Sequence, residues 1–153
     1  MKIIYSQAGK SGSITSIQGL NEMENLKYTF QNNKEITNAK DDLDKLSGAT
    51  VTFPNLKTMY YSFNASNITN WDISLPELTS GINAFSSSNL QTWNAELPKL
   101  GVGSYMFSNC TSLKEFTNDL PELHTATQMF YGCSSLSKFN SKLPAVTSAT
   151  SMF

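Results

Sequence analysis

Several residue types that build common functional sites are scarce or missing in this sequence. Its 153 residues include no arginine, so lysine supplies all 11 basic residues, and there are one histidine and two cysteines. Without arginine, the chain lacks the planar guanidinium that binds phosphate or carboxylate through two hydrogen bonds. Two cysteines and one histidine cannot complete the four ligands of a zinc site. The composition therefore argues against phosphoryl transfer, and we expect neither a metal site nor a cofactor.

Charge and long apolar segments are also scarce. Charged residues make up 15% of the chain and the formal net charge is −1. No basic field of the kind that attracts nucleic acid or an anionic membrane is therefore expected. No apolar run approaches the roughly 18 residues that a membrane-spanning helix needs, so we expect no membrane insertion. The opening segment, Met1 to Gln7, has too short an apolar stretch for a secretory signal.

A repeat of 22 to 23 residues dominates what is present. Each unit reads Leu-x-x-aromatic, three polar or small residues, Leu-Pro-x-Leu, six residues and Phe, followed by a polar turn. The additional residue of the longer units falls in that turn, where a stacked structure tolerates an insertion. Proline and phenylalanine recur with the same spacings of 22, 22, 23 and 23 residues, at Pro54, Pro76, Pro98, Pro121, Pro144 and at Phe63, Phe85, Phe107, Phe130, Phe153.

The period predicts the fold class. Leucine-rich repeats have periods of this length, and a proline in every unit excludes a continuous helix there. We predict an α/β-type repeat solenoid dominated by β-structure, a right-handed leucine-rich-repeat superhelix with one or two short strands per coil. Equivalent residues of successive coils should stack about 4.8 Å apart. Besides the phenylalanines, the expected internal columns are Ile68, Leu90, Leu113, Leu136, then Trp71, Trp93, Phe116, Phe139, and Leu75, Leu97, Leu120, Leu143.

The units change in regularity along the chain. Residues 57–153 form the regular repeats, and residues 20–56 are degenerate repeats with an insertion that we place within residues 37–52. Residues 1–19 should form an amino-terminal cap, with a short strand from Lys2 to Tyr5 and a glycine-containing loop from Gln7 to Ser13. Within each regular unit one position is small, and we expect a tight corner there; its residues are Gly81, Gly103, Ala126 and Ala149.

The carboxyl-terminal end lacks a polar capping repeat. The last unit stops at Phe153, where the next coil would begin. An uncapped repeat end exposes its apolar cross-section and a row of unpaired strand groups. We therefore expect the chain to be a fragment, or to continue in further copies of the unit, and to self-associate through this end.

Two units carry a more specific pattern. The segments Met106 to Phe116 and Met129 to Phe139 both contain Phe-x-x-Cys-x-x-Leu, and the leucine is followed three residues later by a second aromatic. They resemble the repeat of BspA-type leucine-rich-repeat proteins, which are surface or adhesion proteins of bacteria and some protozoa. The resemblance covers roughly residues 54–153. It implies a curved, β-dominated coil used for binding, with no catalysis and no cofactor.

The residue types that catalyse reactions do not form a convincing set. Cys110 and Cys133 occupy one repeat position, which indicates a stacked column, although a disulfide between neighbouring coils is geometrically possible. His124 takes an outward repeat position, without the nucleophile and orienting group that a catalytic histidine needs. Glu96 and Asp119 are equivalent residues of neighbouring coils, within a mixed polar column rather than a catalytic pair. We therefore predict that the chain is not an enzyme.

The predicted function is recognition. A solenoid presents the outward residues of its repeated strand as a regular grid, and short hydroxyl and amide side chains suit hydrogen bonds to a protein or glycan partner. We expect a surface-adhesion role at the cell surface or outside the cell. The alternative is a structural or host-recognition module of a larger assembly, such as a phage tail in a virion or a surface fibre. The predicted partner-binding residues, which we call the strand-face grid, are Asn70, Asp72, Ser74, Thr92, Asn94, Glu96, Glu115, Thr117, Asp119, Lys138, Asn140 and Lys142.

Overall fold

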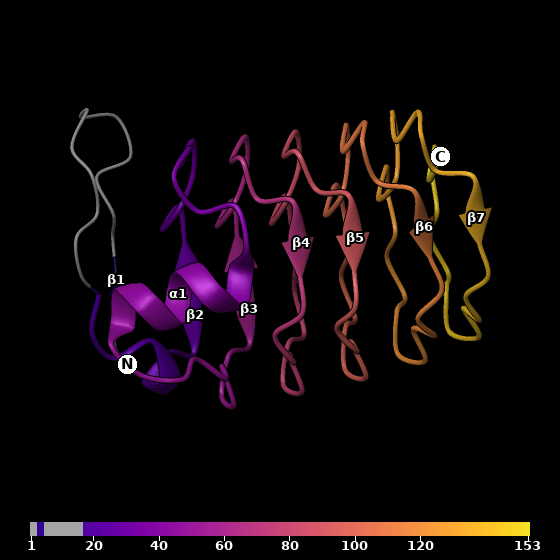
Figure 1. Cartoon of the computed structure of the whole chain (residues 1–153). Helices are drawn as coiled ribbons and strands as arrows, with labels where there is room; N and C mark the ends of the chain where they lie inside the picture. The colour runs from indigo at the N-terminus through magenta and orange to yellow at the C-terminus, as the bar shows by residue number, and fades with distance from the viewer. Residues whose placement is uncertain (1–2, 5–16) are drawn as a thin grey trace.

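The computed structural model describes residues 3–4 and 17–153, and short parallel β-strands dominate this part of the chain. Figure 1 shows successive turns of the backbone lying side by side in chain order, and we call each such turn a coil. The loop predicted from Gln7 to Ser13 lies outside the described residues. The elements are β1 (Ile3–Ile4), the 3-10 helix η1 (Leu20–Glu22), β2 (Asn25–Lys27), α1 (Ala39–Ser47), β3 (Thr58–Tyr60), β4 (Asn70–Trp71), β5 (Thr92–Trp93), β6 (Glu115–Phe116) and β7 (Lys138–Phe139).

One ladder of parallel pairing runs the length of the described chain. Strands β1, β2 and β3 form a three-stranded sheet, in which Leu26 pairs with Met59. Single bridges between neighbouring coils continue the same line beyond β3, at steps of 22 or 23 residues. Parallel pairing at a constant step places equivalent residues of adjacent coils side by side. The rungs in order are Ile3, Asn25, Thr58, Ser80, Val102, Thr125 and Ser148.

A second ladder, on the strands β4 to β7, has one interruption. β4 pairs with β5 and β6 pairs with β7, each in parallel register. The Asn94 amide donates to the Trp71 carbonyl at 2.9 Å, and the equivalent Asn140 amide donates to Phe116 at 3.1 Å. Among the described residues no rung joins β5 to β6, so two separate two-stranded sheets result. The sequence repeat therefore does not produce one continuous sheet on this face.

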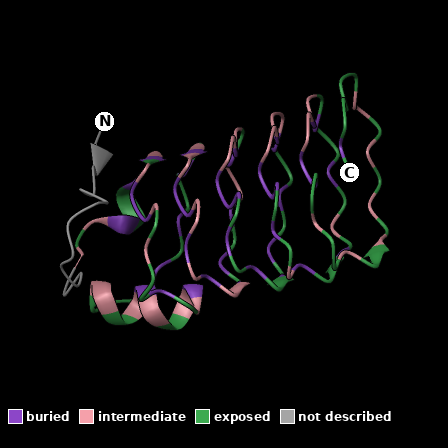
Figure 2. Cartoon of the chain, turned by 90° about the horizontal axis from the view of Figure 1, so that it is seen from above, coloured by how far each residue is buried: buried purple, intermediate pink, exposed green. Residues whose placement is uncertain are grey.

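Stacked aromatic rings fill the interior. The rings of Phe63, Phe85, Phe107 and Phe130 follow one another with centroids 5.4 to 5.9 Å apart and planes within 15° of parallel. The tryptophan and phenylalanine rings of β4 to β7 meet this column mainly edge-on. The predicted inward columns are confirmed for the inner coils, where all their members are buried (Figure 2). In the last coil Leu136, Phe139 and Leu143 are only partly buried, and Phe153 is 62% exposed.

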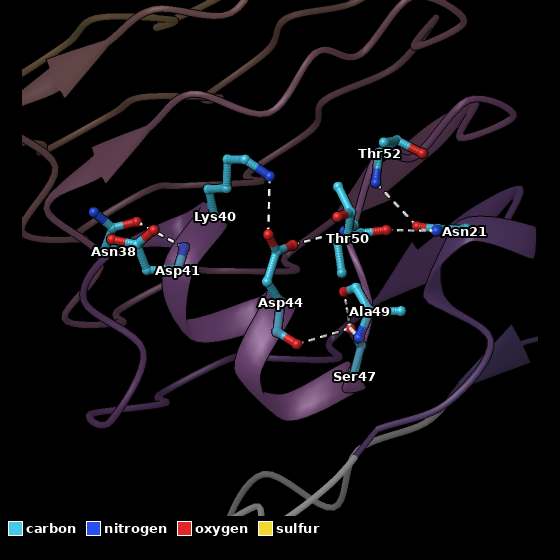
Figure 3. A network of polar contacts seen from close by, with 10 residues as sticks. Asn21, Asn38, Lys40, Asp41, Asp44, Ser47, Ala49, Thr50 and Thr52 are labelled. Carbon is cyan, nitrogen blue, oxygen red and sulfur yellow. Dashed lines mark hydrogen bonds and ion pairs between the residues drawn. The ribbon is translucent and has the colours of Figure 1, made fainter.

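The insertion predicted within residues 37–52 contains a helix that the sequence analysis did not anticipate. Helix α1 begins after Asn38, whose side chain accepts a hydrogen bond from the Asp41 amide, and it ends at Gly48, which has a left-handed φ of 70°. Asp44 joins the helix to its surroundings, because it bonds Lys40 and accepts from the amide of Val51 (Figure 3). Within the described residues α1 is the only α-helix.

The small residues of the repeat have a different cause from the expected tight corner. A side chain at Gly81 would meet the sulfur of Met106 at 2.6 Å, and one at Gly103 would meet that of Met129 at 2.8 Å. Neither glycine has a positive φ. The glycines are therefore small because a methionine of the following coil occupies the space beside them, and packing between coils is complementary in size.

Each coil turns through left-handed backbone on both sides of its buried phenylalanine. Around Phe107, for example, Tyr105 and Asn109 both have a φ of 58°. This conformation costs most residues about 1–2 kcal/mol, and glycine and asparagine adopt it most easily. The residues two positions before each phenylalanine are Tyr28, Tyr61, Asn83, Tyr105, Gln128 and Ser151, and those two positions after are Asn32, Ala65, Ser87, Asn109 and Gly132.

Replacing Phe107 with alanine should lower the free energy of unfolding by about 3–5 kcal/mol, because a large buried ring would leave a cavity. The Phe107 side chain is fully buried and its ring contacts those of Phe85, Trp93, Phe116 and Phe130. Urea unfolding measures the change. The exposed Asn94→Ala should stay within about 0.5 kcal/mol of the parent. Equal losses in the two variants would contradict the assignment of inward and outward faces.

Candidate binding surface

The structure places the strand-face grid on the outside of the coils, as predicted. Eleven of its twelve residues are exposed, and the exception, Asn70, is half-buried where β4 bridges to Asn38. The backbone alternates, so that Trp71, Ile73 and Leu75 point inward while Asp72 and Ser74 remain exposed between them. Exposed grid residues of successive coils therefore form rows along β4 to β7.

Tryptophan side chains help to hold the grid backbone in place. The indole Nε1 of Trp71 donates to the Ile73 carbonyl at 2.8 Å, and that of Trp93 donates to the Ala95 carbonyl at 2.7 Å. Each bond is buried and closes a short loop beneath the outward residue between its partners. Phenylalanine at 116 and 139 cannot make this bond, because it has no donor. The grid is therefore fixed by different contacts in its two halves.

Ion pairs connect coils across the surface with a constant direction. In each pair the carboxylate belongs to the earlier coil and the lysine to the later one. All these groups are substantially exposed, so each pair contributes at most about 1 kcal/mol. The shortest nitrogen-to-oxygen distances are 3.5 Å for Glu24–Lys57, 2.7 Å for Glu77–Lys99, 2.9 Å for Glu115–Lys138 and 4.0 Å for Asp119–Lys142.

A cleft lies in the grid where β5 and β6 fail to pair. Its volume is about 420 Å³. The walls come from two coils: Glu96, Leu97 and Pro98 on one side, and Thr117, Asn118, Asp119 and Pro121 on the other. We call it the β5–β6 cleft. Three of its lining residues, Glu96, Thr117 and Asp119, belong to the grid that the sequence predicted, but the cleft itself was not predicted.

The two cysteines are free and form hydrogen bonds rather than a disulfide. The Cys110 thiol donates to the Phe85 carbonyl, and the Cys133 thiol to the Phe107 carbonyl, both at 3.1 Å. Each therefore satisfies a carbonyl of the preceding coil. Burial raises the pKa of Cys110 to about 12 and that of Cys133 to about 11. Because the thiolate is the nucleophile, neither side chain is prepared for attack at neutral pH.

The structure assembles no catalytic group from the other candidates. His124 is exposed, and its Nδ1 lies 3.3 Å from the hydroxyl of its neighbour Thr125. Residues 3–4 and 17–153 contain no cluster of three or more metal-ligating side chains. No helix in this same part of the chain is long and apolar enough to cross a membrane.

Sequence reasoning missed a group of tyrosines on the other ladder. The rings of Tyr28 and Tyr61 stack with centroids 5.4 Å apart, and Tyr60 meets Tyr61 edge-on at 4.7 Å. The Lys27 ammonium lies 5.4 Å from the Tyr60 ring centroid. The signal was available, since Tyr28 and Tyr61 each stand two residues before a repeat phenylalanine, although Tyr28 belongs to the degenerate part.

Cys110 should react with a thiol reagent only when the protein unfolds. At pH 8 almost all of a thiol with a pKa of about 12 is protonated, and burial also blocks access. The rate of labelling by a disulfide reagent, followed with and without urea, tests this expectation. The variant Cys133→Ser isolates Cys110. Labelling of that variant in native buffer as fast as in urea would contradict the buried thiol.

The chain was compared with known proteins after its geometry was established. No protein-family model matches it. Neither the curated proteins nor the solved structures contain a match.

Proposed function

We propose that the chain is a recognition module: a leucine-rich-repeat solenoid of the BspA type that binds a protein or glycan partner through its strand-face grid. The observation that carries this proposal is the grid itself. Eleven exposed side chains alternate with buried ones on four successive strands, over an interior of stacked rings. A surface that is held rigid before binding loses little conformational entropy when a partner docks.

The chemistry of the grid suits hydrogen bonding. Its inner rows present amides and hydroxyls, such as those of Asn94 and Thr117, whose side chains make no hydrogen bond within the described chain. The grid changes from acidic to basic along the stack, because Glu96 and Asp119 precede Lys138 and Lys142. A partner can therefore be oriented along the coils by charge as well as by shape.

The resemblance of the Phe-x-x-Cys-x-x-Leu units to BspA-type repeats supports an adhesive role at the cell surface or outside the cell. In both units the thiol bonds a carbonyl of the preceding coil, so the cysteine serves stacking between coils. The proposal includes no catalytic step and no cofactor.

The uncovered side of the last coil favours a second candidate, a module that joins other protein in a larger assembly such as a fibre or phage tail. Phe153 is 62% exposed, although its ring continues the buried column 5.9 Å beyond Phe130. A shallow hollow of about 220 Å³ lies beside it, lined by Phe130, Gly132, Cys133, Ser134, Leu136 and Phe153. An apolar edge of this kind is a ready surface for association.

Adding charge to the grid should weaken partner binding by about tenfold or more, through lost hydrogen bonds and an unfavourable charge. The double variant Thr92→Lys with Asn94→Lys is tested against an array of glycans and immobilised extracellular-matrix proteins. The control is Thr111→Lys with Ser134→Lys, which adds the same charge at exposed turn residues. Equal loss in both variants, or a bound partner that ignores the grid variant, would refute this role of the strand face.

Self-association through the last coil is measured separately. Sedimentation velocity of the parent should show a sedimentation coefficient that rises with protein concentration, and Phe153→Ser should reduce this rise because it removes the exposed ring. Tyr131→Ser serves as the control, since Tyr131 is the other large exposed hydrophobic residue of this region. A parent that stays monomeric at every concentration would refute the assembly role for this surface.

A further inference from the structure

Three regularities of the molecule stop together between β5 and β6. The strand ladder has no rung there, although β4–β5 and β6–β7 are paired. The ring column also stops: Trp71 stacks on Trp93 and Phe116 on Phe139, each at 6.1 Å, but among the described residues no ring contact joins Trp93 to Phe116. The amide of Thr117 makes no bond to the Trp93 carbonyl, whereas its equivalents in both neighbouring pairs do.

The sequence supplies a reason for this break. The turn before β5 spans Phe85 to Leu90, and the turn before β6 is one residue longer, from Phe107 to Leu113. Strands that follow turns of equal length stay in register, as β6 and β7 do. The break therefore falls at the single junction between the shorter and the longer unit. The other ladder continues across it from Val102 to Thr125, so the coils separate only on the grid side.

The same junction exchanges an apolar side chain for a polar one. Position 73 is isoleucine and position 95 is alanine, both buried, whereas the equivalent residue of the next coil is Asn118, which is half-buried in the β5–β6 cleft. The Asn118 amide and the Thr117 hydroxyl make no hydrogen bond within the described chain. The cleft therefore offers hydrogen-bonding groups beside the apolar walls of Leu97 and Pro98.

The charges of the cleft break the pattern of the surface. Glu24, Glu77, Glu115 and Asp119 each meet a lysine of the following coil. Glu96 has no such lysine, because Asp119 occupies the equivalent position of the following coil. Two carboxylates therefore line one cleft. The only ammonium near them is that of Lys142, 4.0 Å from Asp119 on a side chain that is 85% exposed.

We propose that the β5–β6 cleft binds a basic side chain, lysine or arginine, of a protein partner. This inference rests on the proposed recognition function and names the chemistry of its partner. The ligand cation takes the place beside Glu96 that a lysine of the next coil takes beside Glu77, where the nitrogen-to-oxygen distances are 2.7 and 2.8 Å. Its aliphatic stem lies against Leu97 and Pro98, and the Thr117 and Asn118 oxygens accept its remaining N–H groups.

Peptide titration of the full chain, followed by ¹H–¹⁵N correlation spectra, tests the cleft. The probe is acetyl-Gly-Arg-Gly-amide, and its matched control replaces arginine with citrulline, which has the same shape but no charge. The arginine peptide should shift the amides of Glu96, Thr117 and Asn118 in a saturable way. The citrulline peptide should shift them far less, and added salt should weaken the arginine effect.

Charge-removing variants show which carboxylate is responsible. Glu96→Gln should weaken arginine-peptide binding about tenfold, whereas Asp72→Asn, which removes the same charge from an exposed grid position outside the cleft, should change it little. Because both side chains are exposed, both variants should keep the parent spectrum elsewhere. Equal effects of the two variants, equal shifts from the two peptides, or shifts spread over all exposed carboxylates would overturn the proposal.

The outcome is separable from that of the proposed function. If the arginine peptide leaves the cleft amides unshifted while Thr92→Lys with Asn94→Lys still abolishes partner binding, the cleft proposal is wrong and the recognition surface stands. If a neutral oligosaccharide shifts the same amides and the arginine peptide does not, the site takes a glycan and the basic-side-chain proposal is also wrong.

Discussion

Register between coils is the constraint on which this structure depends. The buried phenylalanine rings lie 4.8 to 5.9 Å apart from Phe30 to Phe153, close to the roughly 4.8 Å between paired strands. Stacking at that distance requires each coil to return its ring to the same place, which fixes the period at 22 or 23 residues. The left-handed turns around each ring, the bonds of the thiols and the exchange of glycine for methionine all serve this return.

The β5–β6 cleft shows what happens when the constraint is relaxed on one face. One additional residue in a turn is absorbed by the ladder that runs through Val102 and Thr125, but not by the ladder on the grid side. The interior stays filled, since Phe107 still contacts both Trp93 and Phe116. A small change of length therefore creates a recess on the surface without opening the core.

Much of this architecture could be predicted, because the repeat states each position several times. The inward columns and the outward grid follow from alternation alone, and the inner coils confirm them. Helix α1 occurs once, so no comparison between units revealed it, although Asn38, the apolar spacing of Ala39, Leu43 and Leu46, and Gly48 were local signals for it. The cleft and the glycine–methionine packing depend on contacts between coils, which the sequence of one unit does not contain.

The fixed direction of the ion pairs has an evolutionary consequence. Every paired coil offers carboxylates to the coil after it and lysines to the coil before it. Such a unit resembles a building brick with a stud on one side and a socket on the other. A gene segment encoding one coil that is duplicated in tandem therefore meets a compatible neighbour on both sides at once. The array can lengthen by copying, and new surfaces arise wherever a copy later gains or loses a residue in its turn.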